Sequence, residues 1–232
     1  MSVLHLLRHG QASFGQAHYD QLSELGRRQA RLAGQYLGRR GLRLDAVYRG
    51  ALARQRDTAE ALLEGLGARA EVRELREFDE YESGPVIQAL LPAMRAEDPA
   101  MAVAEPRMFS DRRAFQTIYE GAMLRWISGR YDVGPAETWA GFLARAEAGL
   151  ERVRRENGPG RQVMVVTSGG PISAVMRLAL SLADETALRL TWVIKNASLT
   201  SFLFDAQRLT LSLFNSTAHL EQEDDQGLIT YR

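Results

Sequence analysis

The stretch LHLLRHGQAS at residues 4–13 decides the fold, because a run of aliphatic residues ends in arginine, histidine and glycine. A short apolar run bounded by glycine is typical of a buried strand. In an open α/β sheet, the residues that follow a strand lie at the edge where ligands bind. Neutral imidazole is a competent nucleophile, and guanidinium binds phosphate through two parallel hydrogen bonds. Arg8 and His9 therefore indicate phosphoryl chemistry at that edge.

Helical and extended patterns alternate on the carboxyl side of this strand, as they do around a parallel sheet. The first half is expected to contain a helix over 22–41 with Ser23 as its N-cap, a strand at 45–48, a helix over 52–66 and a strand at 70–75. The second half is expected to contain a helix over 138–156, a strand at 162–167, a helix that begins at Pro171, and a hairpin of 198–205 with 208–215. We therefore predict an α/β fold of three layers, with a mostly parallel central sheet flanked by helices and a C-terminal β-hairpin.

The pattern changes between residues 85 and 135 to helices interrupted by proline, glycine and aspartate. This change predicts a helical cap inserted at about 85–135 into one α/β domain that covers residues 1–232. A cap over a pocket is expected to set substrate selectivity.

Composition limits the classes of partner. Lysine plus arginine and aspartate plus glutamate both total 29, so bulk attraction to nucleic acid or to an anionic membrane is not expected. The chain has no cysteine, which excludes thiol nucleophiles and disulfides. The four histidines lack metal-binding spacing, so neither a metal nor another cofactor is expected. No secretory signal or membrane span is recognisable, and we expect a cytoplasmic protein.

Four segments together resemble the histidine phosphatase superfamily, also called the phosphoglycerate mutase-like family. They are LLRHGQA at 6–12, ALARQRDTAE at 51–60, ELREFDEYES at 74–83 and SGGPI at 168–172. The resemblance implies that His9 is the nucleophile and that Arg8 binds phosphate. It also assigns Arg54 to the phosphate, because Arg54 stands four residues before Thr58. Arg56 is expected at the surface instead.

The remaining site residues follow from the same resemblance. Glu77 is the predicted general acid, with Glu82 as the alternative, because five acidic residues crowd this segment. Gln11 and Ser13 follow His9 closely enough to line the pocket.

Ser168 is the main departure, since the family has a second histidine there. Ser168 and Gly169 are expected to contact phosphate, although Ser168 is equally explained as a helix cap. His5 is expected in the core or just behind the site, and His18 on a loop at the surface. His219 is expected to be structural, and it is the one candidate to replace the missing histidine in space.

The predicted reaction is phosphate monoester hydrolysis through a phosphohistidine, slowed or retuned by Ser168. One alternative is a protein that binds a phosphorylated ligand without turnover. The other is a phosphoglycerate mutase, which the short stretch between the Arg-His-Gly motif and the first helix disfavours. The expected partner is a phosphorylated small molecule, with a phosphorylated protein as the alternative. A homodimer and the physiological substrate are left open.

Overall fold

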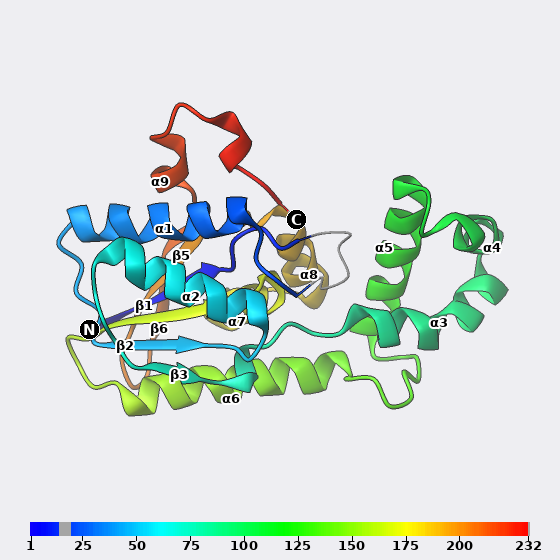
Figure 1. The fold of residues 1–232 in the computed structure, drawn as a ribbon. Helices are drawn as coiled ribbons and strands as arrows, with labels where there is room; N and C mark the ends of the chain where they lie inside the picture. The colour runs from blue at the N-terminus through cyan, green and yellow to red at the C-terminus, as the bar shows by residue number, and fades with distance from the viewer. Residues whose placement is uncertain (14–19, 232) are drawn as a thin grey trace. The chain divides into compact units, whose positions relative to one another are not determined.

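The computed structural model describes residues 1–13 and 20–231, and its strands form one mixed sheet (Figure 1). In this part of the chain the sheet has six strands in the order β3-β2-β4-β1-β5-β6. The strands are β1 Ser2–Arg8, β2 Ala46–Arg49, β3 Val72–Glu74, β4 Gln162–Thr167, β5 Leu199–Phe204 and β6 Leu209–Ser216. The pairings among β3, β2, β4 and β1 are parallel, and β5 and β6 add antiparallel to β1. The mostly parallel sheet and the C-terminal hairpin are confirmed.

The two central strands, β1 and β4, carry aliphatic side chains to both faces of the sheet. Leu4 and Leu6 pack on one face, whereas Leu7 packs on the other. Burial on both faces explains why the sequence reads as a continuous apolar run rather than an alternating one. Arg8 pairs in register with Thr167, so the carboxyl ends of the two strands lie side by side.

Helices cover both faces of the sheet and complete the three predicted layers. Helices α1 Glu24–Arg39 and α2 Ala53–Leu66 pack on one face. On the other face lie α7 Gly169–Leu180 and the part of α6 Trp139–Glu156 that includes Leu150. Ser23 caps α1 as predicted, because its side chain accepts a hydrogen bond from the amide of Gly26.

Two predicted boundaries were wrong. Helix α7 begins at Gly169 and not at Pro171, which is its third residue. Proline fits there because amides of the first helical turn have no partner within the helix. The strand expected at 70–75 is shortened to β3, which is followed by a 3₁₀ turn, η1 Arg76–Phe78.

The chain divides into two compact units, 1–80 with 145–232 and 81–144. The first unit holds the sheet and also α8 Asp184–Val193, α9 Ala218–Glu221 and η3 Gln226–Leu228. The second unit contains α3 Ser83–Glu97, α4 Pro99–Ala104, η2 Glu105–Arg107 and α5 Arg112–Ser128. The insertion predicted at about 85–135 lies within the second unit. In the described ranges, no helix is long and apolar enough to cross a membrane.

Aromatic side chains form the core of the second unit. The ring centroids of Tyr81 and Trp126 are 4.7 Å apart, and those of Trp126 and Trp139 are 5.1 Å apart. Helix α5 buries Ile118 and Trp126. These rings therefore pack within the unit's own interior.

Candidate active site

His9 lies directly after β1, where its backbone is held on two sides. Its amide donates to the carbonyl of Thr167 at 2.8 Å. Its carbonyl accepts from the amide of Ala197 at 3.1 Å and from Nδ2 of Asn196 at 3.3 Å. The residue is 7% exposed. The imidazole is therefore fixed where the carboxyl ends of β1 and β4 meet.

Two hydrogen bonds define the tautomer of His9. Nδ1 lies 2.7 Å from the carbonyl oxygen of Gly10, which can only accept, so Nδ1 carries the proton. Nε2 then holds a lone pair and accepts from Nε of Arg54 at 3.2 Å. Burial first, and then the positive charges of Arg54 and Arg8, hold the pKa of His9 well below its usual value. A neutral imidazole with Nε2 as its nucleophilic atom is the state suited to attack on phosphorus.

Arg54 is the second residue of α2, and Thr58 one turn later fixes its backbone to the loop after β1. The Thr58 hydroxyl donates to the carbonyl of Arg54 at 2.7 Å and accepts from the amide of Gly10 at 3.1 Å. Nη1 of Arg54 donates to the carboxylate of Asp20 at 2.6 Å. The other oxygen of Asp20 accepts from the amide of Ala53 at 2.7 Å. The start of α2 thus already holds an anionic group.

Arg8 is the last residue of β1. Its Nη1 donates to the carbonyl of Ile194, and its Nε lies 4.0 Å from where a Cβ on Gly169 would be. The structure therefore brings Arg8, His9 and Arg54 together from two distant stretches of the chain. In contrast, Arg56 is exposed and pairs with Asp57, as expected of a surface charge.

Ser168 takes part in a buried polar network between α2 and α7. It occupies the N-cap position of α7, but among the described residues its side chain makes no capping hydrogen bond. Its hydroxyl instead accepts from Nε2 of Gln55 at 2.9 Å. Nε2 also donates to the carbonyl of Phe78 at 3.1 Å, and Oε1 of Gln55 accepts from the amide of Leu52 at 3.3 Å. Contact of Ser168 with phosphate stays a prediction.

Sequence reasoning missed the role of Gln55, which is fully buried. Its position in the third residue of α2 is favourable for a glutamine that caps the helix start, and this was the available signal.

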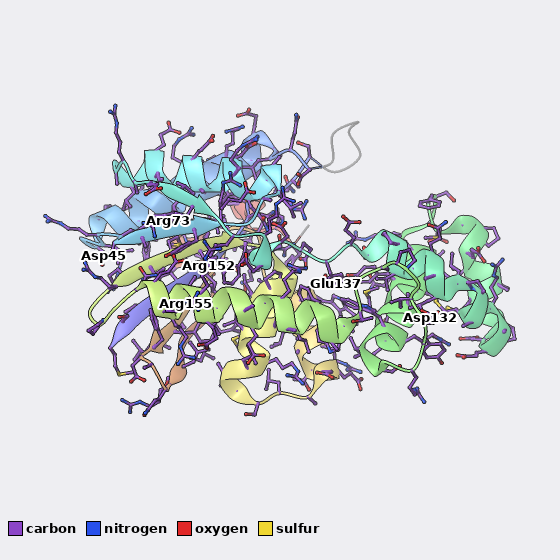
Figure 2. All side chains as sticks on the ribbon, turned by 90° about the horizontal axis from the view of Figure 1, so that it is seen from below. Asp45, Arg73, Asp132, Glu137, Arg152 and Arg155 are labelled. Carbon is purple, nitrogen blue, oxygen red and sulfur yellow. The ribbon has the colours of Figure 1, made fainter. Side chains whose placement is uncertain are left out.

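The acidic segment after β3 is arranged differently from the pattern that the motif suggested. The Glu77 carboxylate lies 3.7 Å from Nη1 of Arg152, and the Glu77 Cβ lies beside Gly149 of the same helix, α6. Figure 2 shows Arg152 on this helix. Asp79 and Glu80 instead contact helix starts at the sheet edge. Oδ1 of Asp79 accepts from the amide of Ala51 at 2.5 Å, and burial raises the pKa of Asp79.

Glu80 extends toward the start of α7. Its Oε2 accepts from the amide of Gly170 at 3.0 Å. Glu82, the alternative acid, belongs to the second unit and holds the N-cap position of α3. Crowding of acidic residues in the sequence could not distinguish among these positions.

The other predicted pocket residues have local partners. Oε1 of Gln11 accepts from the hydroxyl of Ser23 at 3.2 Å. The amide of Ser13 donates to the carbonyl of Gln21 at 2.8 Å. Both residues lie in the connection from β1 to α1, and their contact with substrate stays a prediction. His18 lies outside the described residues.

Two further histidines have structural partners. His5 contacts the Ser201 hydroxyl at 2.8 Å and Oε1 of Gln162 at 3.0 Å, both within the sheet. His219 is buried, hydrogen bonds to the backbone of Ala197, and packs with its ring centroid 6.1 Å from that of Tyr36. Burial lowers the pKa of His219 to about 4. These contacts are consistent with the structural role expected for His219.

A family model of the histidine phosphatase superfamily, branch 1, matches residues 4–217. The chain belongs to the histidine phosphatase superfamily. The match covers all four motifs on which the resemblance rested. A search of curated protein sequences gives no significant match to this chain.

Solved structures of the histidine phosphatase fold match this chain over nearly its whole length. A phosphoglycerate mutase from Bacillus anthracis has a TM-score of 0.65 and 18% identity, and the match covers 95% of this chain and 96% of that one. A phosphoserine phosphatase from Entamoeba histolytica has a TM-score of 0.63 and 17% identity, with 95% and 100% covered. A mycobacterial glucosyl-3-phosphoglycerate phosphatase has a TM-score of 0.61 and 25% identity, with 92% and 98% covered.

Proposed function

We propose that this chain hydrolyses phosphate monoesters through a phosphohistidine at His9. The observation that carries the proposal is the hydrogen bonding of the buried imidazole. Gly10 holds the Nδ1 proton, and Nε2 faces the guanidinium of Arg54. The ring therefore needs no deprotonation before it attacks phosphorus.

In the first step, the lone pair of Nε2 forms the N–P bond while the bond from phosphorus to the ester oxygen breaks. Arg8 and Arg54 bind the equatorial oxygens, over which the charge of the transferring group is spread in the transition state. A carboxyl group gives its proton to the departing oxygen. Water then attacks phosphorus and gives a proton to the carboxylate left by the first step, and the electron pair of the N–P bond returns to Nε2.

The contact between Asp20 and Arg54 supports anion binding at this corner. A carboxylate bridges the guanidinium and the first amide of α2. Helix N-termini stabilise negative charge through free amides and the helix dipole. A phosphoryl group presented to Arg54 would take over part of this electrostatic role.

Ser168 lowers the expected rate. A missing donor to the transferring group typically costs about 2.7 to 4 kcal/mol, or about a hundred- to a thousandfold in rate. The amide of Gly169, at the first position of α7, remains as a donor for a phosphoryl oxygen. We therefore favour a slowed enzyme over an inert binder.

The similar solved structures include phosphatases of small phosphorylated molecules, and this supports a phosphorylated small molecule as substrate. We propose the cytoplasm as the site of action because a chain without cysteine suits a reducing compartment.

The test is hydrolysis of 4-nitrophenyl phosphate by the wild type and by His9→Asn. His5→Asn is the matched control, because His5 lies within the preceding strand β1 and contacts Ser201 and Gln162. We expect turnover by the wild type and the control and none by His9→Asn.

Vanadate binding without hydrolysis of any monoester by the wild type would favour the inert binder instead. Conversion of 3-phosphoglycerate to 2-phosphoglycerate in preference to hydrolysis would favour a mutase.

A further inference from the structure

We propose that Gln29 on α1 and Thr230, which follows η3, are positioning residues for His9. They fix the peptide group whose carbonyl selects the tautomer of the imidazole. The inference rests on the function proposed above, in which Nε2 of His9 is the attacking atom. Neither Gln29 nor Thr230 belongs to the four motifs quoted from the sequence.

The peptide group that joins Gly10 to Gln11 has both of its polar atoms in use. Its carbonyl, on Gly10, accepts from Nδ1 of His9 at 2.7 Å. Its amide, on Gln11, donates to Oε1 of Gln29 at 2.8 Å. A trans peptide is planar, so its C=O and N–H point in opposite directions. The acceptor on Gln29 therefore holds the carbonyl toward His9, and rotation of this peptide would break both hydrogen bonds.

The side chain of Gln29 can present only its oxygen to this peptide. Gln29 is fully buried. Its Nε2 lies 2.7 Å from the carbonyl of Leu228 and 3.0 Å from the hydroxyl of Thr230. A backbone carbonyl only accepts, so the nitrogen must face Leu228, and Oε1 is left for Gln11. The segment after α9 thus determines which way the amide of Gln29 is turned.

Thr230 and Asn196 connect Gln29 back to His9. Nδ2 of the buried Asn196 donates to the carbonyl of His9 at 3.3 Å, which leaves Oδ1 of Asn196 as an acceptor. The Thr230 hydroxyl donates to this Oδ1 at 3.0 Å and accepts from Gln29. The amide of Asn196 also donates to the carbonyl of Thr230 at 2.8 Å. We call this closed set of hydrogen bonds the His9 network; its members are His9, Gly10, Gln11, Gln29, Thr230 and Asn196.

The His9 network allows one direction for each of its hydrogen bonds. The His9 carbonyl and the Gln11 amide fix the two side-chain amides, and these fix the Thr230 hydroxyl. Buried networks with every member satisfied are rigid. The Gly10 carbonyl is therefore kept in place for Nδ1–H, and Nε2 of His9 keeps its lone pair for phosphorus. Loss of the acceptor on Gln29 frees the peptide to turn and the proton to move to Nε2.

The first measurement is the tautomer of His9, which needs no turnover. The lowered pKa of His9 keeps the ring neutral near neutral pH, and a long-range proton–nitrogen NMR spectrum then shows which nitrogen carries the proton. We expect the proton on Nδ1 in the wild type. Gln29→Met keeps an unbranched side chain but loses the amide, and a share of the protons should move to Nε2. Thr230→Val should move a smaller share.

The second measurement is hydrolysis of 4-nitrophenyl phosphate. We expect kcat to fall by about ten- to a hundredfold in Gln29→Met, because a misplaced nucleophile attacks poorly. The inhibition constant of inorganic phosphate should change by about twofold or less, since Arg8 and Arg54 are untouched. Thr230→Val should lower kcat by about three- to tenfold, and Thr230→Ser, which keeps the hydroxyl, should retain the wild-type rate.

Arg28→Gln is the matched control. Arg28 precedes Gln29 on α1 and pairs with Asp225 at 2.7 Å, so it also joins this helix to the segment after α9. The two side chains are 48% and 42% exposed, and neither belongs to the His9 network. We expect the tautomer of His9 and kcat to stay at their wild-type values in this variant.

The tautomer decides the outcome. A proton that stays on Nδ1 of His9 in Thr230→Val and in a folded Gln29→Met would overturn the inference, whatever the rates. If Gln29→Met does not fold, Thr230→Val alone decides. If these variants change the tautomer but the wild type neither hydrolyses monoesters nor is phosphorylated, the proposed function fails and the positioning role stands.

Discussion

Replacement of Arg54 by glutamine perturbs the site at one defined contact. The guanidinium donates to Nε2 of His9 at 3.2 Å and is the second cause, after burial, of the lowered pKa of that histidine. Loss of a preorganised donor to the transferring phosphoryl group costs about 2.7 to 4 kcal/mol. We therefore expect kcat/KM to fall by about a hundred- to a thousandfold in Arg54→Gln, and the pKa of His9 to rise because a positive charge has been removed.

Arg56→Gln is the matched control, since Arg56 lies two residues further along the same helix and pairs with Asp57 at the surface. Substitutions at such positions change stability by about 0.5 kcal/mol or less, and kcat/KM should stay at the wild-type value. The assay is steady-state hydrolysis of 4-nitrophenyl phosphate, with an NMR titration of the His9 imidazole. Equal rates in the two variants, or an unchanged pKa of His9 in Arg54→Gln, would refute the arrangement described here.

Three further predictions concern stability. His219 has a pKa of about 4 when folded and takes up its proton near pH 6.5 when unfolded, so protonation favours the unfolded chain as pH falls from about 6.5 to 4. The free energy of unfolding, measured with urea, should therefore fall by about 2 kcal/mol between about pH 8 and about pH 5 because of this residue. His219→Asn should lack that part of the pH dependence, and a variant with the same pH dependence as the wild type would refute the burial effect. In Gly10→Ala the new Cβ would lie 2.3 Å from the carbonyl oxygen of Gly26, so we expect a loss of about 1 to 3 kcal/mol in unfolding free energy, whereas Gly84→Ala, which has open space, should change little; equal melting temperatures would contradict the close approach. Gln55→Leu removes the donor to Ser168 and Phe78 and should cost about 1 to 3 kcal/mol, measured by thermal unfolding, and a neutral result would show that the network is not required.

Local pattern was enough to predict the elements that position the nucleophile. The aliphatic run before Arg8 specified a strand buried on both faces, and Ser23 marked a helix start by its capping chemistry. The order of elements then placed Arg54 at the same sheet edge as His9, because parallel strands end on one side. The strand and the helix start needed only local pattern and capping chemistry, whereas the role of Arg54 came from the resemblance to the histidine phosphatase superfamily.

Side-chain direction within the irregular segment after β3 could not be predicted. The turn η1 directs Glu77 toward α6 and leaves Asp79 and Glu80 at helix starts, and this depends on contacts from Gln55 and Thr167 that are distant in sequence. The start of α7 was also missed, because proline is tolerated throughout the first turn.

Trapping of the phosphorylated enzyme tests the central claim most directly. Rapid quenching during turnover of an aryl phosphate, followed by peptide mass spectrometry and NMR of the labelled histidine, would identify the modified atom. Because Nδ1 of His9 donates to Gly10, we predict an acid-labile, base-stable phosphoryl group on Nε2 of His9. A phosphoryl group on Nδ1 or on another residue, or labelling that persists in His9→Ala, would contradict the account.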